Sequence, residues 1–135
     1  NFFDPQWSPT RDLVVIDSRC GEISSILLVD MNSGAVRPLT SQITDSSDPS
    51  WSPDGSRLIF HSTDATLKSD SYIVDVDGTN LRRLVDELYG VWSPDGERIL
   101  FSSSEGNLYT IDVDGSNLQW LTFDKERLIA YGWSR

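Results

Sequence analysis

Cysteine is almost absent from this sequence, which has only Cys20 among its 135 residues. A lone cysteine excludes a disulfide within the chain and a zinc site built from cysteines. We therefore interpret Cys20 as a small buried hydrophobic residue. Long apolar runs are also missing, because no stretch approaches the roughly 18 residues that a membrane-spanning helix requires. Insertion into a membrane is therefore not expected.

Basic residues are scarce as well. The chain has 11 lysines and arginines against 21 aspartates and glutamates, which gives a formal net charge of -10. Such a charge repels a phosphate backbone instead of releasing its counterions. We therefore expect neither nucleic acid nor an anionic membrane among the partners. The first residue is Asn1 rather than methionine, as expected of a processed chain or an excised piece.

Helical periodicity of useful length is also lacking, whereas a Trp-Ser motif recurs at intervals of 44, 41 and 41 residues, at Trp7, Trp51, Trp92 and Trp133. A period near 40 with about four short strands per copy is typical of β-propeller blades. We predict an all-β fold, a partial β-propeller of about three four-stranded antiparallel blades plus the first strand of a fourth. Residues 1–135 then form one propeller fragment with blades at about 3–40, 47–85 and 88–122, and residues 129–135 start a further blade.

Two kinds of tight turn punctuate each repeat. In Ser52–Gly55 and Ser93–Gly96 the proline presets φ and the glycine accepts left-handed geometry. The runs that follow, 57–61 and 98–102, are apolar on successive residues, as expected of strands that are covered on both faces. The first unit has Thr10-Arg11-Asp12 at this place, so we expect its turn to be looser.

The second turn lies in an Asp-Val-Asp-Gly motif at 75–78 and 112–115, and Asp-Gly between two apolar runs is a strong hairpin signal. The motif resembles the opening of a calcium loop, but neither copy has the glutamate required at the twelfth position. Turn-forming aspartates are the favoured interpretation. Pro38 in the following strand has no N–H to donate, which predicts a strand at the sheet edge.

The Trp-Ser-Pro-Asp-Gly turn, the Arg-Leu-Ile-Phe strand at 57–60 and the hairpin at 72–78 resemble the repeats of TolB-type, WD40-like β-propellers. The resemblance covers essentially the whole chain. It implies a non-catalytic, TolB-like scaffold for protein or peptide binding in the periplasm or outside the cell. Two alternatives stay open. The chain is the gating propeller of a prolyl-oligopeptidase-like peptidase whose hydrolase domain lies outside these residues, or it binds a glycan or metal ion at the propeller channel.

Catalytic chemistry has no candidate residues in the sequence. No Gly-x-Ser-x-Gly nucleophile elbow occurs, and His61 is the single histidine, with no nucleophile context beside it. We therefore expect no enzyme activity, no cofactor and no metal ligand within these residues, and we interpret His61 as a satisfied residue at a strand end.

Candidate binding residues lie three positions before the repeat tryptophans, at Asp4, Asp48 and Tyr89. The resemblance implies that they face the mouth of a central channel, where carboxylates would hydrogen-bond a peptide or hold a cation. The alternative is that each Asp-Pro pair only ends an extended segment. We expect the repeat tryptophans to be buried between blades. Trp120 does not follow the repeat, lies on the outer strand and is a candidate exposed aromatic anchor.

Three blades are fewer than an ordinary closed ring contains. The two outermost blade faces are then uncovered, which a soluble monomer tolerates poorly. We expect either the remaining blades of a parent protein or a second copy of the chain, joined head to tail, to complete the ring. Within a blade, the middle loop and the crossover vary most in length, and recognition is expected at that end.

Overall fold

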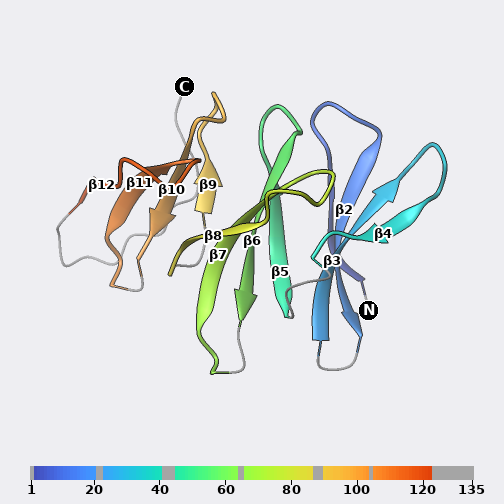
Figure 1. Cartoon of the computed structure of the whole chain (residues 1–135), viewed down its shortest axis with the longest axis horizontal. Coiled ribbons are helices and arrows are strands. Elements are labelled where there is room, and N and C mark those ends of the chain that lie inside the picture. The colour runs from blue at the N-terminus through green and yellow to red at the C-terminus, as the bar shows by residue number, and fades with distance from the viewer. Residues whose placement is uncertain are drawn as a thin grey trace.

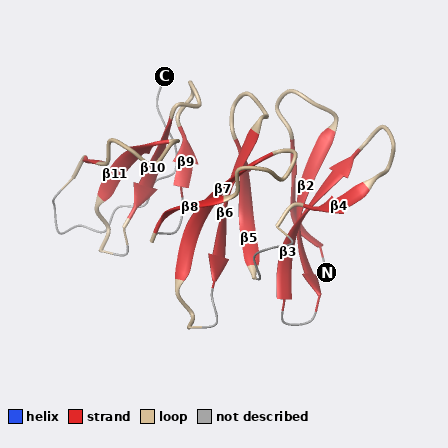
Figure 2. Cartoon of the chain, viewed as in Figure 1, coloured by secondary structure: helices blue, strands red, loops and turns tan. Residues whose placement is uncertain are grey.

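The computed structural model describes residues 2–20, 23–40, 45–63, 66–86, 90–103 and 105–122. Within these ranges the chain forms 12 β-strands and no helix, arranged as three four-stranded sheets (Figure 1, Figure 2). The predicted all-β fold with three four-stranded antiparallel blades is therefore confirmed. No helix in the described part of the chain is long and apolar enough to cross a membrane. Residues 129–135, predicted to start a further blade, lie outside the described residues.

Each blade is a meander, in which neighbouring strands in the sheet are also consecutive along the chain. Blade 1 consists of β1 (Phe2–Trp7), β2 (Leu13–Cys20), β3 (Ile23–Asp30) and β4 (Val36–Pro38). Blade 2 consists of β5 (Ser46–Trp51), β6 (Arg57–Thr63), β7 (Ser69–Asp75) and β8 (Arg82–Val85). Blade 3 consists of β9 (Gly90–Trp92), β10 (Arg98–Ser102), β11 (Leu108–Asp112) and β12 (Gln119–Trp120). Figure 1 shows the three sheets side by side in chain order.

The hydrophobic core lies between the blades. One cluster joins side chains of blades 1 and 2, including the fully buried Val15, Ile26 and Phe60. A second cluster joins blades 2 and 3, including Ile59 and Phe101. Blade 2 thus buries both of its faces, which is why its central strand β6 is apolar on successive residues instead of alternating. Burial of this apolar surface holds the sheets together.

The blades approach each other most closely along their first strands. β5 contacts β1, β2 and β3 of the preceding blade, and β9 contacts β5. The last strands lie at the sheet edges, and those of blades 1 and 3, β4 and β12, are exposed along their whole length. Pro38 lies in β4, as predicted for a residue that cannot donate to a neighbouring strand.

Two repeat tryptophans make the same contact with the preceding blade. The Trp51 side chain donates through Nε1 to the Gln6 carbonyl oxygen at 3.1 Å, and Trp92 donates to the Ser50 carbonyl oxygen at 3.1 Å. In both cases the acceptor residue directly precedes the tryptophan of the preceding blade. Both rings are buried, so each indole fills space between two blades and has its polar N–H satisfied there.

Trp7 differs from the other two, and its side chain is 62% exposed. The predicted burial of the repeat tryptophans is correct for Trp51 and Trp92 and wrong for Trp7. The physical reason is that no sheet precedes blade 1 in the described part of the chain, so nothing covers the Trp7 ring or supplies an acceptor for its N–H. Trp133 lies outside the described residues.

The first turn of blade 1 shares one hydrogen bond with its counterpart in blade 2: Ser8 donates its backbone N–H to the Leu13 carbonyl at 2.8 Å, and Ser52 donates to Arg57 at 2.9 Å. In blade 2, Gly55 also donates its N–H to the Ser52 carbonyl at 2.9 Å, and among the described residues no equivalent bond joins Arg11 to Ser8, as expected of a looser turn. Neighbouring turns also touch, because Thr10 Oγ1 donates to the Asp54 carbonyl at 2.9 Å, beside Gly55, whose φ is 68°.

We predict that Trp51→Ala or Trp92→Ala lowers the free energy of unfolding by about 3–5 kcal/mol, because each removes a large buried aromatic ring and leaves a cavity. The matched control is Trp7→Ala, which removes an exposed ring and is expected to cost less than about 1 kcal/mol. Chemical denaturation of the three variants checks this. Equal losses for all three would contradict the assigned difference in burial.

Candidate ligand-binding groove

The aspartates of the first turns are committed to hydrogen bonds within those turns. Asp54 accepts from Ser52 Oγ at 2.6 Å, from Ser56 Oγ at 2.7 Å and from the Ser56 N–H at 3.0 Å. The hydrogen bond from the Ser52 hydroxyl, and to a smaller extent those from Ser56, lower the pKa of Asp54 to about 2. Asp95 repeats the arrangement with Ser93, and its pKa is also lowered. These carboxylates hold the turns in shape.

The aspartates of the second turns behave in the same way. Asp77 accepts from the Thr79 N–H at 2.8 Å and hydroxyl at 2.6 Å, and Asp114 accepts from the equivalent groups of Ser116 at 2.8 and 2.6 Å. Those hydroxyls are the main cause of the lowered pKa of both carboxyls. The interpretation of Asp77 and Asp114 as turn-forming is confirmed by these contacts. In the described ranges no three His, Cys, Asp or Glu side chains gather in a way that could hold a metal ion.

Arginines on the last strands reach the second turn of the next blade. Arg37 of β4 donates to the carbonyls of Val76 and Asp77 in blade 2. Arg82 of β8 makes the same contact with the Val113 carbonyl in blade 3. Adjacent blades are therefore joined by a charged hydrogen bond near their outer strands, in addition to the tryptophan contact at their first strands.

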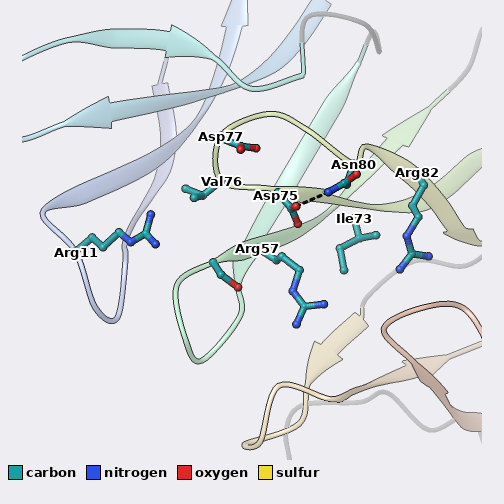
Figure 3. A pocket seen from close by; sticks show the side chains of 9 residues that line it. Arg11, Arg57, Ile73, Asp75, Val76, Asp77, Asn80 and Arg82 are labelled. Atoms are coloured by element: carbon teal, nitrogen blue, oxygen red, sulfur yellow. Dashed lines mark hydrogen bonds between the residues drawn. The ribbon is translucent and has the colours of Figure 1, made fainter.

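A groove of about 680 Å³ opens beside these contacts, at the end of blade 2 that carries both kinds of turn (Figure 3). It combines basic, acidic and apolar side chains. Its main lining residues are Arg11, Arg57, Ile73, Asp75, Asn80 and Arg82.

The strand register places most of these side chains on one face of blade 2. Arg57 pairs across the sheet with Asp75, and Ile73 pairs with Arg82. Residues two apart on a strand share a face, so these four residues form one patch. Figure 3 shows Arg57 and Arg82 on either side of Ile73. Arg11 reaches the groove from the first turn of blade 1.

The groove contains positively and negatively charged side chains with hydrogen-bonding groups that are not used within the described residues. The guanidinium groups of Arg11 and Arg57 have no hydrogen-bond acceptor among the described residues. The Arg57 group lies over the Trp92 ring, 5.7 Å from its centroid. Asp75 accepts through Oδ2 from Asn80 Nδ2 at 2.7 Å, and its Oδ1 has no donor in the described part of the chain. Two cationic groups and one carboxylate oxygen are thus available to a ligand.

Of the predicted site residues, Asp48 has the most complete environment. It lies in β5 at an irregularity in the pairing with β6, and its φ is 52°. Its Oδ2 is 3.8 Å from Nδ1 of the buried His61 and accepts from Ser47 Oγ at 3.1 Å. The nearby His61 side chain is the main cause of the lowered pKa of Asp48. His61 of β6 is therefore buried beside a carboxylate. Sequence reasoning missed this pairing, because it depends on strand register.

Two of the other predicted site residues cannot be compared with Asp48, because their side chains lie outside the described residues. Asp4 lies in β1 at the corresponding irregularity, but its side chain is outside the described residues, as is the whole of Tyr89. Trp120 lies on the outer strand of blade 3, is 47% exposed and has its ring centroid 5.1 Å from that of Tyr109. A shared channel mouth and an aromatic anchor at Trp120 both stay predictions.

Sequence reasoning also missed the groove. The sequence feature that could have indicated the groove is Arg11, which stands where the other two repeats have Gly55 and Gly96. We interpreted this difference only as a departure from the repeat. That Arg11 and Arg57 of the next blade line one groove follows from the stacking of the blades, which no local pattern reports.

Comparisons with known proteins identify relatives over most of the chain. The family model described as "TolB beta propeller domain" matches residues 1–135. TolB from Acinetobacter baumannii has a TM-score of 0.74 at 22% identity, and the alignment covers 95% of this chain and 33% of TolB. A putative TolB from Agrobacterium tumefaciens has a TM-score of 0.71 at 26% identity, covering 84% of this chain and 43% of that protein. The "Uncharacterized peptidase YuxL" of Bacillus subtilis (strain 168) is 38% identical over 94 residues, or 65% of this chain and only 14% of the relative.

We predict that the Asp54 turn loses stability in acid. Because the folded pKa of Asp54 lies below 3.8, its contribution is complete above about pH 4 and is lost as the pH falls through about 2. At pH 6, Asp54→Asn should lower the free energy of unfolding by about 1 kcal/mol, a value reduced for solvent screening. At pH 2, where the folded carboxyl is about half ionised, most of the difference should be lost. Urea denaturation at both pH values measures it, and a difference that does not change with pH would contradict the assignment.

Proposed function

The chain belongs to the TolB β-propeller domain family, and on that premise we propose that it is a non-catalytic scaffold that binds a protein or peptide partner. The observation that carries the proposal is the groove on blade 2, where Arg11 and Arg57 keep their guanidinium groups available. The turn aspartates of the described blades are, in contrast, committed to their own turns. Donors held on rigid sheets suit recognition, because little conformational freedom is lost on binding.

A second candidate function rests on a different observation. The 38% identity with a relative named as a peptidase supports the alternative that the chain is the propeller portion of a peptidase whose hydrolase domain lies outside these residues. The 135 residues contain no Gly-x-Ser-x-Gly motif of their own. A parent reading frame that continues into such a motif would favour this alternative, and one that does not would favour the scaffold.

The proposed location is the periplasm or the cell exterior. It is supported by the same family membership. Fractionation of the source organism, with the chain followed by antibody, distinguishes these compartments from the cytoplasm. Recovery in the cytoplasmic fraction alone would count against the proposal.

We propose that the exposed face of blade 1 is covered by another blade in the working protein. Trp51 and Trp92 each take a carbonyl acceptor from a preceding blade, and Trp7 presents the same group uncovered. The chain spans about a third of the TolB structure that it matches, so the covering blade comes either from a longer parent protein or from a second copy. Sedimentation of the 135-residue chain separates the two sources. A dimer in which Trp7→Ala weakens association supports a second copy, and a monomer at high concentration excludes it.

The scaffold itself is tested by capture of a partner. The folded chain, immobilised on beads, should retain a specific protein or peptide from an extract of its source, and beads that carry the chemically unfolded chain serve as the control. The bound material is identified by mass spectrometry. Failure to enrich any component above the unfolded control would contradict a protein-binding function.

A further inference from the structure

We infer that the groove on blade 2 is a subsite for an acidic side chain of an extended peptide. The inference rests on the proposed scaffold function and adds the chemistry of the ligand. Three of the chain's 11 basic residues, Arg11, Arg57 and Arg82, line this one groove in a molecule whose net charge is -10. A local concentration of positive charge on such an acidic surface attracts an anionic group to that place.

The two unused guanidinium groups suit a carboxylate. A guanidinium group is planar and donates two parallel hydrogen bonds to the two oxygens of a carboxylate. Arg57 is held in position by its contact with the Trp92 ring, so it is already oriented before a ligand arrives. Arg11 comes from the exposed turn of blade 1 and approaches from the other side of the groove (Figure 3). Arg82 is fixed by its hydrogen bond to the next blade and adds positive charge.

The acidic residues of the groove narrow the choice of anion. Asp75 and Asp77 lie among the arginines, so a doubly charged phosphate would meet two carboxylates as well as the cations. Asp75 Oδ1 is also free to accept a hydrogen bond from a backbone N–H beside the acidic side chain. A peptide supplies the carboxylate and the N–H together.

The corresponding grooves on the other two blades lack this combination. The groove on blade 1, of about 320 Å³, has Leu13 in place of Arg57, and its arginines Arg11 and Arg37 are matched by Asp30 and Asp77. The groove on blade 3, of about 500 Å³, contains Arg57 and Arg98, and there the acidic residues Glu97, Asp112 and Asp114 outnumber them. For that groove, Gly55 stands at the position of Arg11 and Gln119 at the position of Arg82. The difference between repeats therefore concentrates the three arginines at one of the three described grooves.

The experiment uses a fluorescein-labelled peptide of alternating glycine and glutamate with an amidated C-terminus, titrated with the folded chain at low ionic strength. Arg11→Gln and Arg57→Gln are each expected to weaken binding by about tenfold, the loss of one charged hydrogen-bonding partner. The matched control is Arg83→Gln, which removes the same charge from the adjacent residue on the opposite face of β8 and should leave the dissociation constant unchanged. Arg11→Gln alters only an exposed turn, so the test does not depend on Arg57→Gln remaining folded.

Two further peptides identify the group that is bound. A glutamine-for-glutamate peptide should not bind, and a free C-terminus on the glutamine peptide should not restore binding if a side-chain carboxylate is the ligand. The inference is overturned if the glutamine peptide binds as tightly, if Arg83→Gln weakens binding as much as Arg11→Gln, or if the glutamate peptide does not bind at all. This inference and the scaffold function can fail independently. If the Arg11→Gln/Arg57→Gln double variant still retains a captured partner, the scaffold function stands and the groove is not the binding site.

Discussion

The contact between a tryptophan indole and a carbonyl of the preceding blade sets the arrangement of the sheets. Trp51 and Trp92 each place a large apolar ring between two blades and satisfy the single polar atom of that ring with one backbone acceptor. Burial of the ring supplies most of the free energy, and the hydrogen bond fixes where along the first strand the next blade sits. The same contact repeats with the same atoms, so each blade takes its position from the one before it.

The outer strands and turns complete this arrangement. Arg37 and Arg82 donate to carbonyls of the following blade, so adjacent sheets are joined near both their first and their last strands. The aspartates of the turns are occupied by neighbouring hydroxyl and N–H groups, which hold each turn in shape. These contacts limit rotation between the sheets, so the backbone positions of Arg11 and Arg57, from two blades, are held at one groove. A recognition groove formed by two blades depends on that arrangement.

Much of the fold was predictable from the sequence, because the repeat recurs at one spacing and each turn carries its own residue signals. The burial of Trp51 and Trp92 followed from their period, whereas the exposure of Trp7 did not, since it depends on what lies beyond blade 1. The candidate site was less predictable. The pairing of His61 with Asp48 depends on strand register, and the meeting of arginines from two blades depends on how the sheets stack. Neither is a local property of the sequence.

Hydrogen exchange of the tryptophan indole N–H groups, followed by NMR on chain labelled with ¹⁵N at tryptophan, measures whether the indole contacts hold the blades together. An N–H that is buried and hydrogen-bonded exchanges only when the structure opens, whereas an exposed one exchanges freely. We predict strong protection of the Trp51 and Trp92 indoles and rapid exchange at Trp7. Equal exchange rates at all three would contradict this prediction, because the indole contacts would then not be holding the blades together.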